Sequence, residues 1–234
     1  MTLFLHEVHR VRGLCEEEFE AHYRDRWMPA LCDGPNGDDA RLLWYAHQAH
    51  GSGPAYRIVT ITAVADGAAY QRLVDRTATG DLRTWARDLD GLQHDSIGKV
   101  LLALAWSPLA SVDLATVPVE PDVHELTLYM EDTGWPHAPL DDYTAFWEEV
   151  YAPMLERSPL LRIEACFQTA LGAGRRPEAI LMQKVLSHEG LLRLFETETR
   201  PELKQPGTFM HDALQVRDQW ESRLLRTSAW SPMF

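Results

Sequence analysis

The chain has 234 residues, of which 45% are hydrophobic and 24% charged, a balance typical of a folded globular protein. Its 22 basic and 35 acidic side chains give a formal net charge of −13, which disfavours nucleic acid and anionic membrane as partners because both are bound by clustered positive charge. The three cysteines are far apart and show no C-x-x-C spacing, so they indicate free thiols in a reducing compartment. The sequence predicts neither a secretory signal nor a membrane span and favours a cytoplasmic protein.

The first half of the chain alternates between strand and helix patterns. Residues 3–11 are rich in apolar side chains, and residues 16–31 follow with an acidic start that suits the N-terminus of an amphipathic helix. The turn sequence HGSGP separates two further apolar runs, which predicts a pair of strands. The expected order is strand 3–11, helix 16–31, strands 41–48 and 56–64, a helical region over 67–94 that breaks near Thr79-Gly80, and strand 99–106.

The second half repeats the first. Trp106-Ser107-Pro108 recurs 124 residues later as Trp230-Ser231-Pro232. At the same spacing EEFEAHYRDRWMPAL matches DDYTAFWEEVYAPML, and His6-Glu7-Val8 matches His124-Glu125-Leu126 at a spacing of 118. Three matches in the same order indicate an internal duplication, and a loop of different length explains the change of spacing.

Each repeat therefore has the order βαββαβ, which is the ferredoxin-like arrangement. In the second repeat the expected elements are strand 123–131, helix 140–157, strands 161–170 and 179–186, helices within 188–220, and strand 222–230. The first repeat is expected to span residues 1–110, a linker 111–122, and the second repeat 123–234. The predicted fold class is α+β, with two tandem ferredoxin-like βαββαβ repeats.

Three features resemble NIPSNAP-type proteins of the dimeric α+β barrel superfamily. They are a first strand that carries a glutamate, a helix that ends in aromatic-x-Pro, and a terminal RLLR-x-x-x-aromatic-Ser-Pro strand, most clearly within 123–157 and 217–233. The resemblance implies that two ferredoxin-like sheets face each other and form an intramolecular α+β barrel, with helices outside. Family members often carry an arginine two residues after the strand glutamate, whereas this chain has His9 and Thr127 there.

Polar residues at alternate strand positions predict a cavity inside this barrel, because one face of each strand meets the helices and the other lines the interior. In the segment ELTLYM the apolar side chains are expected to pack on helices, which turns Glu125 and Tyr129 inward. The repeat then assigns Glu7 and His9 to the interior, and the alternation in LLRIEACFQ adds further polar positions. The expected site comprises Glu125, His9, Glu7 and Tyr129 as catalytic residues, and Arg162, Glu164, Trp44 and Tyr45 as substrate-binding residues.

The expected base is Glu125 or His9, because an enclosed carboxylate has a raised pKa and histidine titrates near neutral pH. Arg162 would hold an anionic oxygen of the substrate, and Tyr129 would donate a proton or a hydrogen bond. A structural alternative stays open, in which Glu125 and Arg162 form a buried ion pair and His9 is only hydrogen-bonded.

No metal or other cofactor is expected. The pairs His6/His9 and His47/His50 have a ligand-like spacing, but residues three apart on a strand point to opposite faces and cannot share a metal ion. The sequence also shows no G-x-G-x-x-G, G-x-x-x-x-G-K-[ST], G-x-S-x-G or H-E-x-x-H motif.

The first interpretation is a cofactor-independent lyase, isomerase or cyclase, or a cofactor-free monooxygenase, that works by general acid–base chemistry in the barrel cavity. The resemblance implies such chemistry, with a hydrophobic secondary metabolite as the substrate. One alternative is a haem-dependent enzyme, since chlorite-dismutase-like proteins also have tandem ferredoxin-like halves at this length. The other is a ligand-binding barrel without catalysis, because a fold alone does not specify a function. The expected partners are a small molecule and, as an option, a second copy of the chain.

Overall fold

The structure of the chain is a computed structural model that describes residues 1–33, 37–157, 160–174, 176–196 and 198–234. The chain divides into two compact units. Unit 1 comprises Met1–Leu102, Ser111–Thr127 and Leu224–Phe234, and unit 2 comprises Ala103–Ala110 and Leu128–Arg223. None of the described helices is long and apolar enough to cross a membrane.

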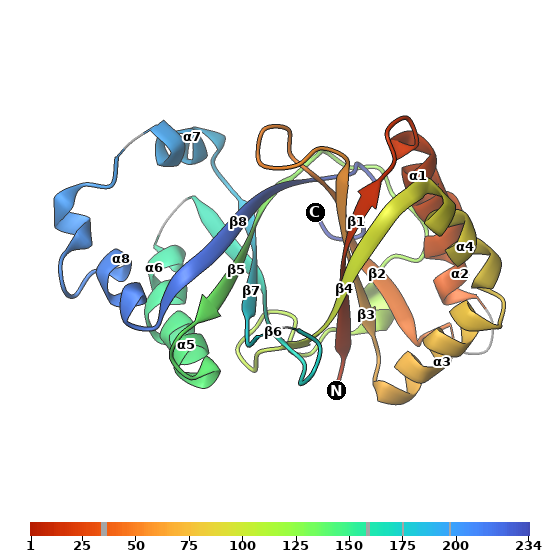
Figure 1. Cartoon of the computed structure of the whole chain (residues 1–234), viewed down its shortest axis with the longest axis horizontal. Coiled ribbons are helices and arrows are strands. Elements are labelled where there is room, and N and C mark those ends of the chain that lie inside the picture. Colours follow the sequence, from red (N-terminus) through yellow and green to blue (C-terminus); the bar gives the residue numbers. More distant parts are fainter. Residues whose placement is uncertain (34–36, 158–159, 175, 197) are drawn as a thin grey trace. The chain divides into compact units, whose positions relative to one another are not determined.

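Unit 1 is an antiparallel sheet with helices on one face (Figure 1). Its strands lie in the order β4–β1–β3–β2, and the C-terminal part of β8 pairs with β2. The elements are β1 (Leu3–Val11), α1 (Glu16–His22), a π-helical turn (Tyr23–Trp27), α2 (Met28–Cys32), β2 (Ala40–Gln48), β3 (Arg57–Val64), α3 (Gly67–Ala78), α4 (Arg83–Leu92), β4 (Gln93–Ala103) and a 3₁₀ turn (Leu114–Thr116).

The helices of unit 1 begin where the sequence offers a local reason. Asp66 caps α3, since its side chain accepts a hydrogen bond from the amide of Ala69. Helix α1 starts with three glutamates, which suit the positive end of the helix dipole. The core beneath the helices includes the buried side chains of Val11, Phe19, Tyr23, Met28, Leu31, Leu42, Tyr45, Ile58, Leu89 and Trp230.

Unit 2 has the strand order β6–β7–β5, with the N-terminal part of β8 beside β5. Its elements are β5 (Leu128–Pro136), α5 (Leu140–Phe146), a π-helical turn (Trp147–Tyr151), α6 (Ala152–Glu156), β6 (Leu161–Thr169), β7 (Ala179–Val185), α7 (His188–Glu196), α8 (Phe209–Asp212) and β8 (Arg217–Thr227), with 3₁₀ turns at Pro201–Lys204 and Ala213–Gln215.

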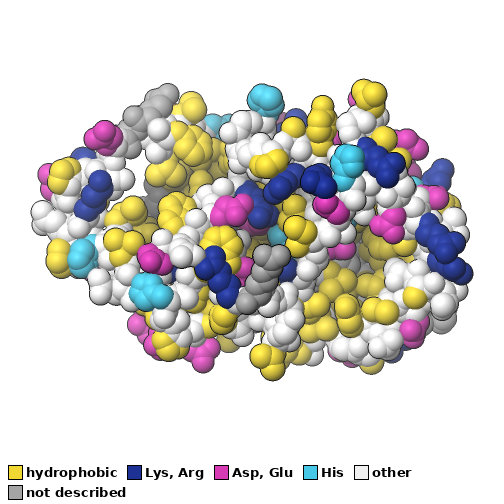
Figure 2. Space-filling model, in the orientation of Figure 1, with side chains coloured by type: hydrophobic (Ala, Val, Ile, Leu, Met, Phe, Trp, Pro, Cys, Tyr) yellow, Lys and Arg dark blue, Asp and Glu magenta, His cyan; other side chains and the backbone are white. Residues whose placement is uncertain are grey.

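The helices of unit 2 differ in how much apolar surface they bury. Helix α5 and its π-helical turn bury Tyr143 and Trp147. In α7, by contrast, Leu192, Leu194 and Phe195 are each more than 50% exposed. Figure 2 shows hydrophobic side chains gathered at the place that α7 occupies in Figure 1. The segment from α5 to α6 is therefore the main apolar cover of this sheet.

The predicted α+β class with two βαββαβ repeats is confirmed, and most expected elements lie within two residues of their expected bounds. Three strands are displaced. The strands expected at 99–106 and 222–230 begin earlier, at Gln93 and Arg217. Their first residues are polar, so no hydrophobic pattern marks where these strands start. The strand expected at 123–131 is Leu128–Pro136, so the structural match to Leu3–Val11 has a spacing of 125 and the match at 118 is wrong.

The duplication extends to irregular features of the backbone. Both α1 and α5 continue into a π-helical turn, and these turns are 124 residues apart. The strand register shifts between Leu42 and Trp44 in β2, and between Ile163 and Ala165 in β6. Such turns and bulges are local departures from regular geometry, so their recurrence at matching positions supports a common origin of the two repeats.

The two Trp-Ser-Pro segments belong to the unit that the other repeat mainly builds. The Ser107 hydroxyl accepts a hydrogen bond from the Cys166 amide at 2.9 Å, within unit 2. The Ser231 hydroxyl accepts one from the Tyr45 amide at 3.1 Å, within unit 1. The units are defined by packing and the repeats by sequence order, so the repeat bounds 1–110, 111–122 and 123–234 stay a prediction.

Candidate functional site

The face of β1 that carries His9 meets the helices of unit 1. The His9 ring lies 5.2 Å from that of Phe19 and 5.6 Å from that of Tyr23, measured between centroids, and both rings belong to the helix-side core. Strand alternation places Glu7 on the same face. The expectation that Glu7 and His9 face away from the helices is therefore wrong. The spacings of 118 and 125 differ by an odd number, which inverts the strand phase.

Hydrogen bonds to uncharged side chains surround the His9 ring. Its Nδ1 lies 2.9 Å from Gln93 Oε1, while the Gln93 amide nitrogen donates to Asp90 at 3.0 Å. Because the Gln93 oxygen can only accept, His9 Nδ1 carries the ring proton. His9 Nε2 then accepts from the hydroxyl of Thr60 at 3.1 Å or of Tyr23 at 3.2 Å. Burial lowers the pKa of His9, so the imidazole is neutral.

This network has the character of a structural core. His9, Tyr23 and Thr60 expose at most 4% of their surface. Burial also raises the pKa of Tyr23 well above its usual value, which keeps its hydroxyl protonated. The geometry thus favours the structural alternative for His9, and its catalytic role stays a prediction.

A second polar cluster of unit 1 ties the C-terminal segment to α1. Glu20 accepts a hydrogen bond from the Trp230 indole at 2.8 Å and lies 2.9 Å from His47 Nε2. Burial alone would raise the pKa of Glu20, but hydrogen bonds from His47, Ser228 and Trp230 outweigh it and lower the pKa to about 2. Tyr45, an expected substrate-binding residue, packs against Trp230 within the helix-side core, with the two ring centroids 4.9 Å apart.

Three other expected site residues occupy different environments. Trp44 is fully buried and pairs with Ile61, on the opposite face of the sheet from Thr60. Glu125 is exposed and precedes β5, so the expectation that it points inward from a strand is wrong. Tyr129 is buried on the face of β5 that points away from the helices, which agrees with its expected orientation.

Arg162 and Glu164 are together, at the start of β6. Arg162 lies on the face away from the helices, as expected, but its side chain is 58% exposed and pairs with Glu164 at 2.5 Å. Glu164 occupies the β-bulge of this strand, where regular alternation breaks. An exposed ion pair contributes little to stability and leaves the guanidinium solvated.

In unit 2 the helix-covered face of β5 carries a different set of residues. At the spacing of 125 residues, Asp132 occupies the position of Glu7, and Gly134 occupies that of His9. Gly134 lets Tyr143 of α5 lie against the strand, since a Cβ atom there would come within 2.0 Å of the Tyr143 hydroxyl oxygen. The space of an imidazole in unit 1 is therefore taken by a phenol in unit 2.

Polar side chains from two neighbouring strands hold Asp132. Gln183 Nε2 donates to Asp132 Oδ2 at 2.8 Å, and the Ser222 hydroxyl contacts Oδ1. Gln183 Oε1 in turn accepts from the Tyr151 hydroxyl at 2.6 Å. Burial raises the pKa of Asp132, and the hydrogen bonds from Ser222 and Gln183 together with the charge of Arg217 oppose it only in part.

Aromatic rings and one arginine complete the surroundings of Asp132. The rings form two pairs with centroid distances of 4.6 and 4.7 Å, Tyr143–Trp147 and Tyr151–Phe209. Arg217 acts electrostatically on Asp132 and Tyr143, and its Nε is buried without a hydrogen-bond partner among the described residues. A buried donor is costly unless something accepts from it. Arg217 therefore offers a place for an oxygen atom of a ligand.

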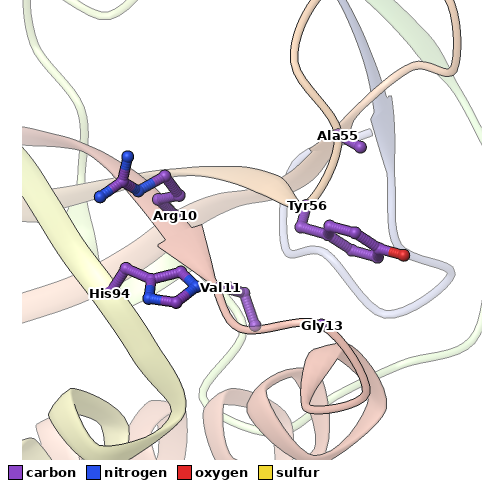
Figure 3. Close-up of a pocket in the computed structure, with 6 residues that line it drawn as sticks. All are labelled: Arg10, Val11, Gly13, Ala55, Tyr56 and His94. Atoms are coloured by element: carbon purple, nitrogen blue, oxygen red, sulfur yellow. The ribbon is translucent and has the colours of Figure 1, made fainter.

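A surface hollow of about 480 Å³ in unit 1 is a weaker candidate. Figure 3 shows the Arg10 guanidinium and the Tyr56 ring on different sides of it, pointing apart. Arg10 pairs with Asp95 at 2.5 Å, and Tyr56, with a φ of 58°, has its carbonyl bound by the Val11 amide at 2.9 Å. The hollow is lined by Arg10, Val11, Gly13, Ala55, Tyr56 and His94, whose polar groups do not converge.

Within the described ranges, no three His, Cys, Asp or Glu side chains are placed to share a metal ion. The alternation of β1 puts His6 and His9 on opposite faces, and His9 is taken up by the helix-side network. That the protein works without a metal stays a prediction.

Sequence reasoning misses Asp132, Gln183 and Ser222. The expected strand ends at residue 131 and the expected last strand begins at residue 222, so neither displays the contact between them. The repeat spacing of 124 is the pattern that could have revealed this contact, because it aligns Ser222 with Gly98. The same spacing aligns the polar residues with which β4 and β8 begin.

Comparison with known proteins finds a match in fold only. No protein-family model matches the chain, and no curated protein matches its sequence. An anthrone oxidase-like protein of known structure is 9% identical, covers 97% of this chain and 91% of its own, and has a TM-score of 0.60. A protein from Lactobacillus acidophilus NCFM that is provisionally named a monooxygenase is 7% identical, covers 99% of this chain and 97% of its own, and has a TM-score of 0.58.

The expected NIPSNAP resemblance is also found, over about half of the chain. A NIPSNAP family protein from Agrobacterium tumefaciens str. C58 is 19% identical, covers 47% of this chain and 99% of its own, and has a TM-score of 0.37. Identities this low describe a shared fold and leave the chemistry to the residues of each site. What this chain shares with its full-length structural neighbours is the predicted α+β fold.

Proposed function

We propose that this protein is a small-molecule enzyme that works by general acid–base catalysis on the helix-covered face of unit 2, with Asp132 as the proton-transferring group. The observation that carries the proposal is a carboxyl whose two oxygens are held by different neighbours, Gln183 and Ser222, and whose pKa is raised by burial. A carboxylic acid that keeps its proton toward neutral pH can donate it to a substrate, and its partly desolvated carboxylate is a stronger base.

Arg217 and Tyr143 supply the complementary groups. Arg217 has a buried Nε donor without a partner among the described residues, and burial keeps the Tyr143 hydroxyl protonated by raising its pKa. Both groups can donate hydrogen bonds to a substrate oxygen that gains negative charge during the reaction. Arg217 thereby takes the role that the sequence suggested for Arg162.

The surrounding rings favour a hydrophobic, aromatic substrate. One tilted and one stacked aromatic pair lie near the carboxyl, and aromatic side chains bind flat rings through large contact areas. The name of one structural neighbour, an anthrone oxidase-like protein, fits such a substrate. We propose removal of a proton from a carbon next to a carbonyl group, since this step can begin a lyase, isomerase or cyclase reaction. The C–H bond breaks, the proton passes to the Asp132 carboxylate, and the enolate oxygen is held by Arg217 and Tyr143.

Deuterium exchange tests the proton-transfer step directly, whichever reaction follows it. Anthrone and a panel of other enolisable aromatic ketones are incubated with the protein in D₂O, and loss of the C–H signal is followed by NMR. Wild-type protein is expected to accelerate exchange, and Asp132→Asn to reduce the acceleration by about 10²-fold or more. Asp141→Asn, at an exposed acidic position at the start of α5, is the matched control and retains full exchange.

Three results would redirect the assignment. Full exchange in a folded Asp132→Asn variant would contradict the role of Asp132 and direct the search to the opposite face of the sheet, where Tyr129 and Arg162 lie. An absorbance band near 400 nm in the purified protein would favour the haem alternative. Tight binding of one of the ketones by wild type and by Asp132→Asn, without deuterium exchange in either, would favour a ligand-binding protein.

A further inference from the structure

We infer that the Ser222 hydroxyl is the relay through which Asp132 exchanges its proton with solvent. The inference rests on the proposed role of Asp132 and adds the route by which this base releases to solvent the proton that it takes from the substrate. It follows from which carboxyl oxygen can carry the proton and from which neighbour of that oxygen reaches water.

The Tyr151 hydroxyl decides which oxygen of Asp132 can be protonated. It donates to Gln183 Oε1 at 2.6 Å, and burial raises its pKa, so it remains a donor. The Gln183 amide is thereby oriented with its nitrogen toward Asp132, and it donates to Oδ2 at 2.8 Å. The Gln183 amide nitrogen cannot accept a hydrogen bond from a proton on Oδ2, whereas the Ser222 hydroxyl beside Oδ1 can accept one. The proton of neutral Asp132 therefore belongs on Oδ1.

Ser222 is the neighbour of Oδ1, and it is exposed. A serine hydroxyl can accept a proton through a lone pair while it releases its own, so it can pass a proton between a carboxyl and water. The other groups around Asp132 are poor routes, because Gln183, Tyr143 and Tyr151 expose at most 8% of their surface.

The charged groups near Asp132 do not offer a competing route. Arg217 of β8 acts on Asp132 through its positive charge, and a guanidinium group has no lone pair with which to accept a proton. Glu131 is adjacent in β5 but is directed to the opposite face of the strand, where it pairs with Arg223 at 3.2 Å. Asp132 is itself only half-buried, so direct exchange of its carboxyl with water is the competing route, and the Ser222 variants distinguish the two.

The first repeat shows that this hydroxyl is not required by the fold. The position that matches Ser222 at a spacing of 124 is Gly98, which pairs with Glu7 across β1 and β4. A strand of the same architecture therefore forms without a side chain at this point. Substitution of Ser222 is expected to leave unit 2 folded.

The test follows the proton at Asp132 itself and needs no substrate. The carboxyl carbon of Asp132 is labelled with ¹³C, and its resonance reports both the pKa and, by relaxation dispersion at the midpoint of titration, the rate of proton exchange. Ser222→Ala is expected to raise the pKa of Asp132, because the ionised form loses a hydrogen bond, and to slow exchange tenfold or more. Ser222→Thr keeps the hydroxyl and is expected to restore both quantities.

The possible outcomes separate the relay from the function on which it rests. A pKa of Asp132 at its ordinary value in the wild-type protein would defeat the proposed function. A raised pKa with an unchanged exchange rate in Ser222→Ala would defeat the relay alone, since a merely structural hydrogen bond shifts the equilibrium without governing the rate. Slow exchange in Ser222→Ala that Ser222→Thr reverses supports the relay.

Discussion

The helix-covered faces of the two units share a scaffold and a carboxyl at the matching strand position, Glu7 and Asp132, but differ in the polar groups beside it. In unit 1 the face is closed around a neutral imidazole, His9, whose two nitrogens are both hydrogen-bonded. In unit 2 it holds an ionisable carboxyl, Asp132, that contacts an exposed serine. A buried polar group that is fully satisfied fixes a core, whereas one whose charged form is disfavoured can do chemistry. The comparison teaches that the same strand position has a closed, hydrogen-bonded core beside it in one repeat and an exposed hydroxyl beside it in the other.

The divergence is coordinated between strand and helix. In unit 1 the strand carries the large His9 and the helix carries Phe19. In unit 2 the strand carries Gly134, and the helix position of Phe19 is taken by Tyr143, whose hydroxyl reaches over the glycine. Each pair fills its own space, so neither member can be exchanged between units by itself.

The largest expected effect comes from filling the space over Gly134. Gly134→Ala places a Cβ atom 2.0 Å from the Tyr143 hydroxyl oxygen, a separation that atoms cannot keep, so the helix or the ring must move. We expect a loss of about 3 kcal/mol in the free energy of unfolding, the upper range for overpacking, measured by urea denaturation.

A double-mutant cycle gives the control. If the cost is the clash, Gly134→Ala should cost well under half as much in a Tyr143→Ala background, where the ring is absent. An equal cost in both backgrounds would show that Gly134 is needed for its backbone rather than for space.

The next effect concerns the closed network of unit 1. His9→Leu leaves Gln93 Oε1, Thr60 and Tyr23 without their shared partner in a buried place, and we expect a loss of about 2–3 kcal/mol in the free energy of unfolding. His94→Leu, at an exposed position of β4, is the control and should change stability by less than about 0.5 kcal/mol. Unchanged stability of His9→Leu together with lost exchange activity would instead restore His9 as the catalytic base.

How far sequence leads in this chain depends on the range of the interaction. The Trp-Ser-Pro repeat and the aromatic-x-Pro helix end, both at a spacing of 124, suffice to predict two βαββαβ repeats, because these patterns are local. The orientation of Tyr129 also follows from local alternation. The phase of β1 fails because His6-Glu7-Val8 resembles a segment that precedes β5, and side-chain alternation alone cannot reveal a register error.

The candidate site lies further beyond sequence reasoning. Asp132 and Gln183 are 51 residues apart, and Asp132 and Ser222 are 90 apart, so their contacts arise only when β5 lies between β7 and β8. The start of β8 is polar and exposed, and such a strand has no hydrophobic pattern to mark it. Arg162 faces the correct way but remains near solvent, since alternation predicts a face and not a depth, and the bulge at Glu164 breaks the alternation.

A smaller effect is expected from the cluster that exists only in unit 1. Glu20 has a lowered pKa, about 2 against a usual value of 4.5, so its ionised form stabilises the fold above pH 4.5 and this contribution is lost as the pH falls toward 2. Glu20→Gln should therefore cost about 2 kcal/mol at neutral pH and almost nothing near pH 2. Denaturation midpoints of both proteins across this range measure the difference. Glu17→Gln, at an exposed position of the same helix, should show no such dependence.

The smallest expected effect is a gain in the free energy of unfolding, whereas the other substitutions lower it. Asn at position 132 can keep both neighbours of Asp132, since its oxygen accepts from Gln183 and its nitrogen donates to the Ser222 hydroxyl.

Burial raises the pKa of Asp132 in the folded protein, so the folded state holds its proton more tightly than the unfolded state does. Below the ordinary pKa both states are protonated and the native interaction is fully present. As the pH rises through the raised pKa, stability is lost because a charge must be buried. Asp132→Asn removes that loss, so it should stabilise unit 2 by about 1 kcal/mol at neutral pH, with a gain that shrinks toward acid pH, while Asp141→Asn gains nothing. Urea denaturation at a series of pH values measures this, and a variant that is less stable than wild type at neutral pH would show that the carboxylate of Asp132 is a structural anion like Glu20.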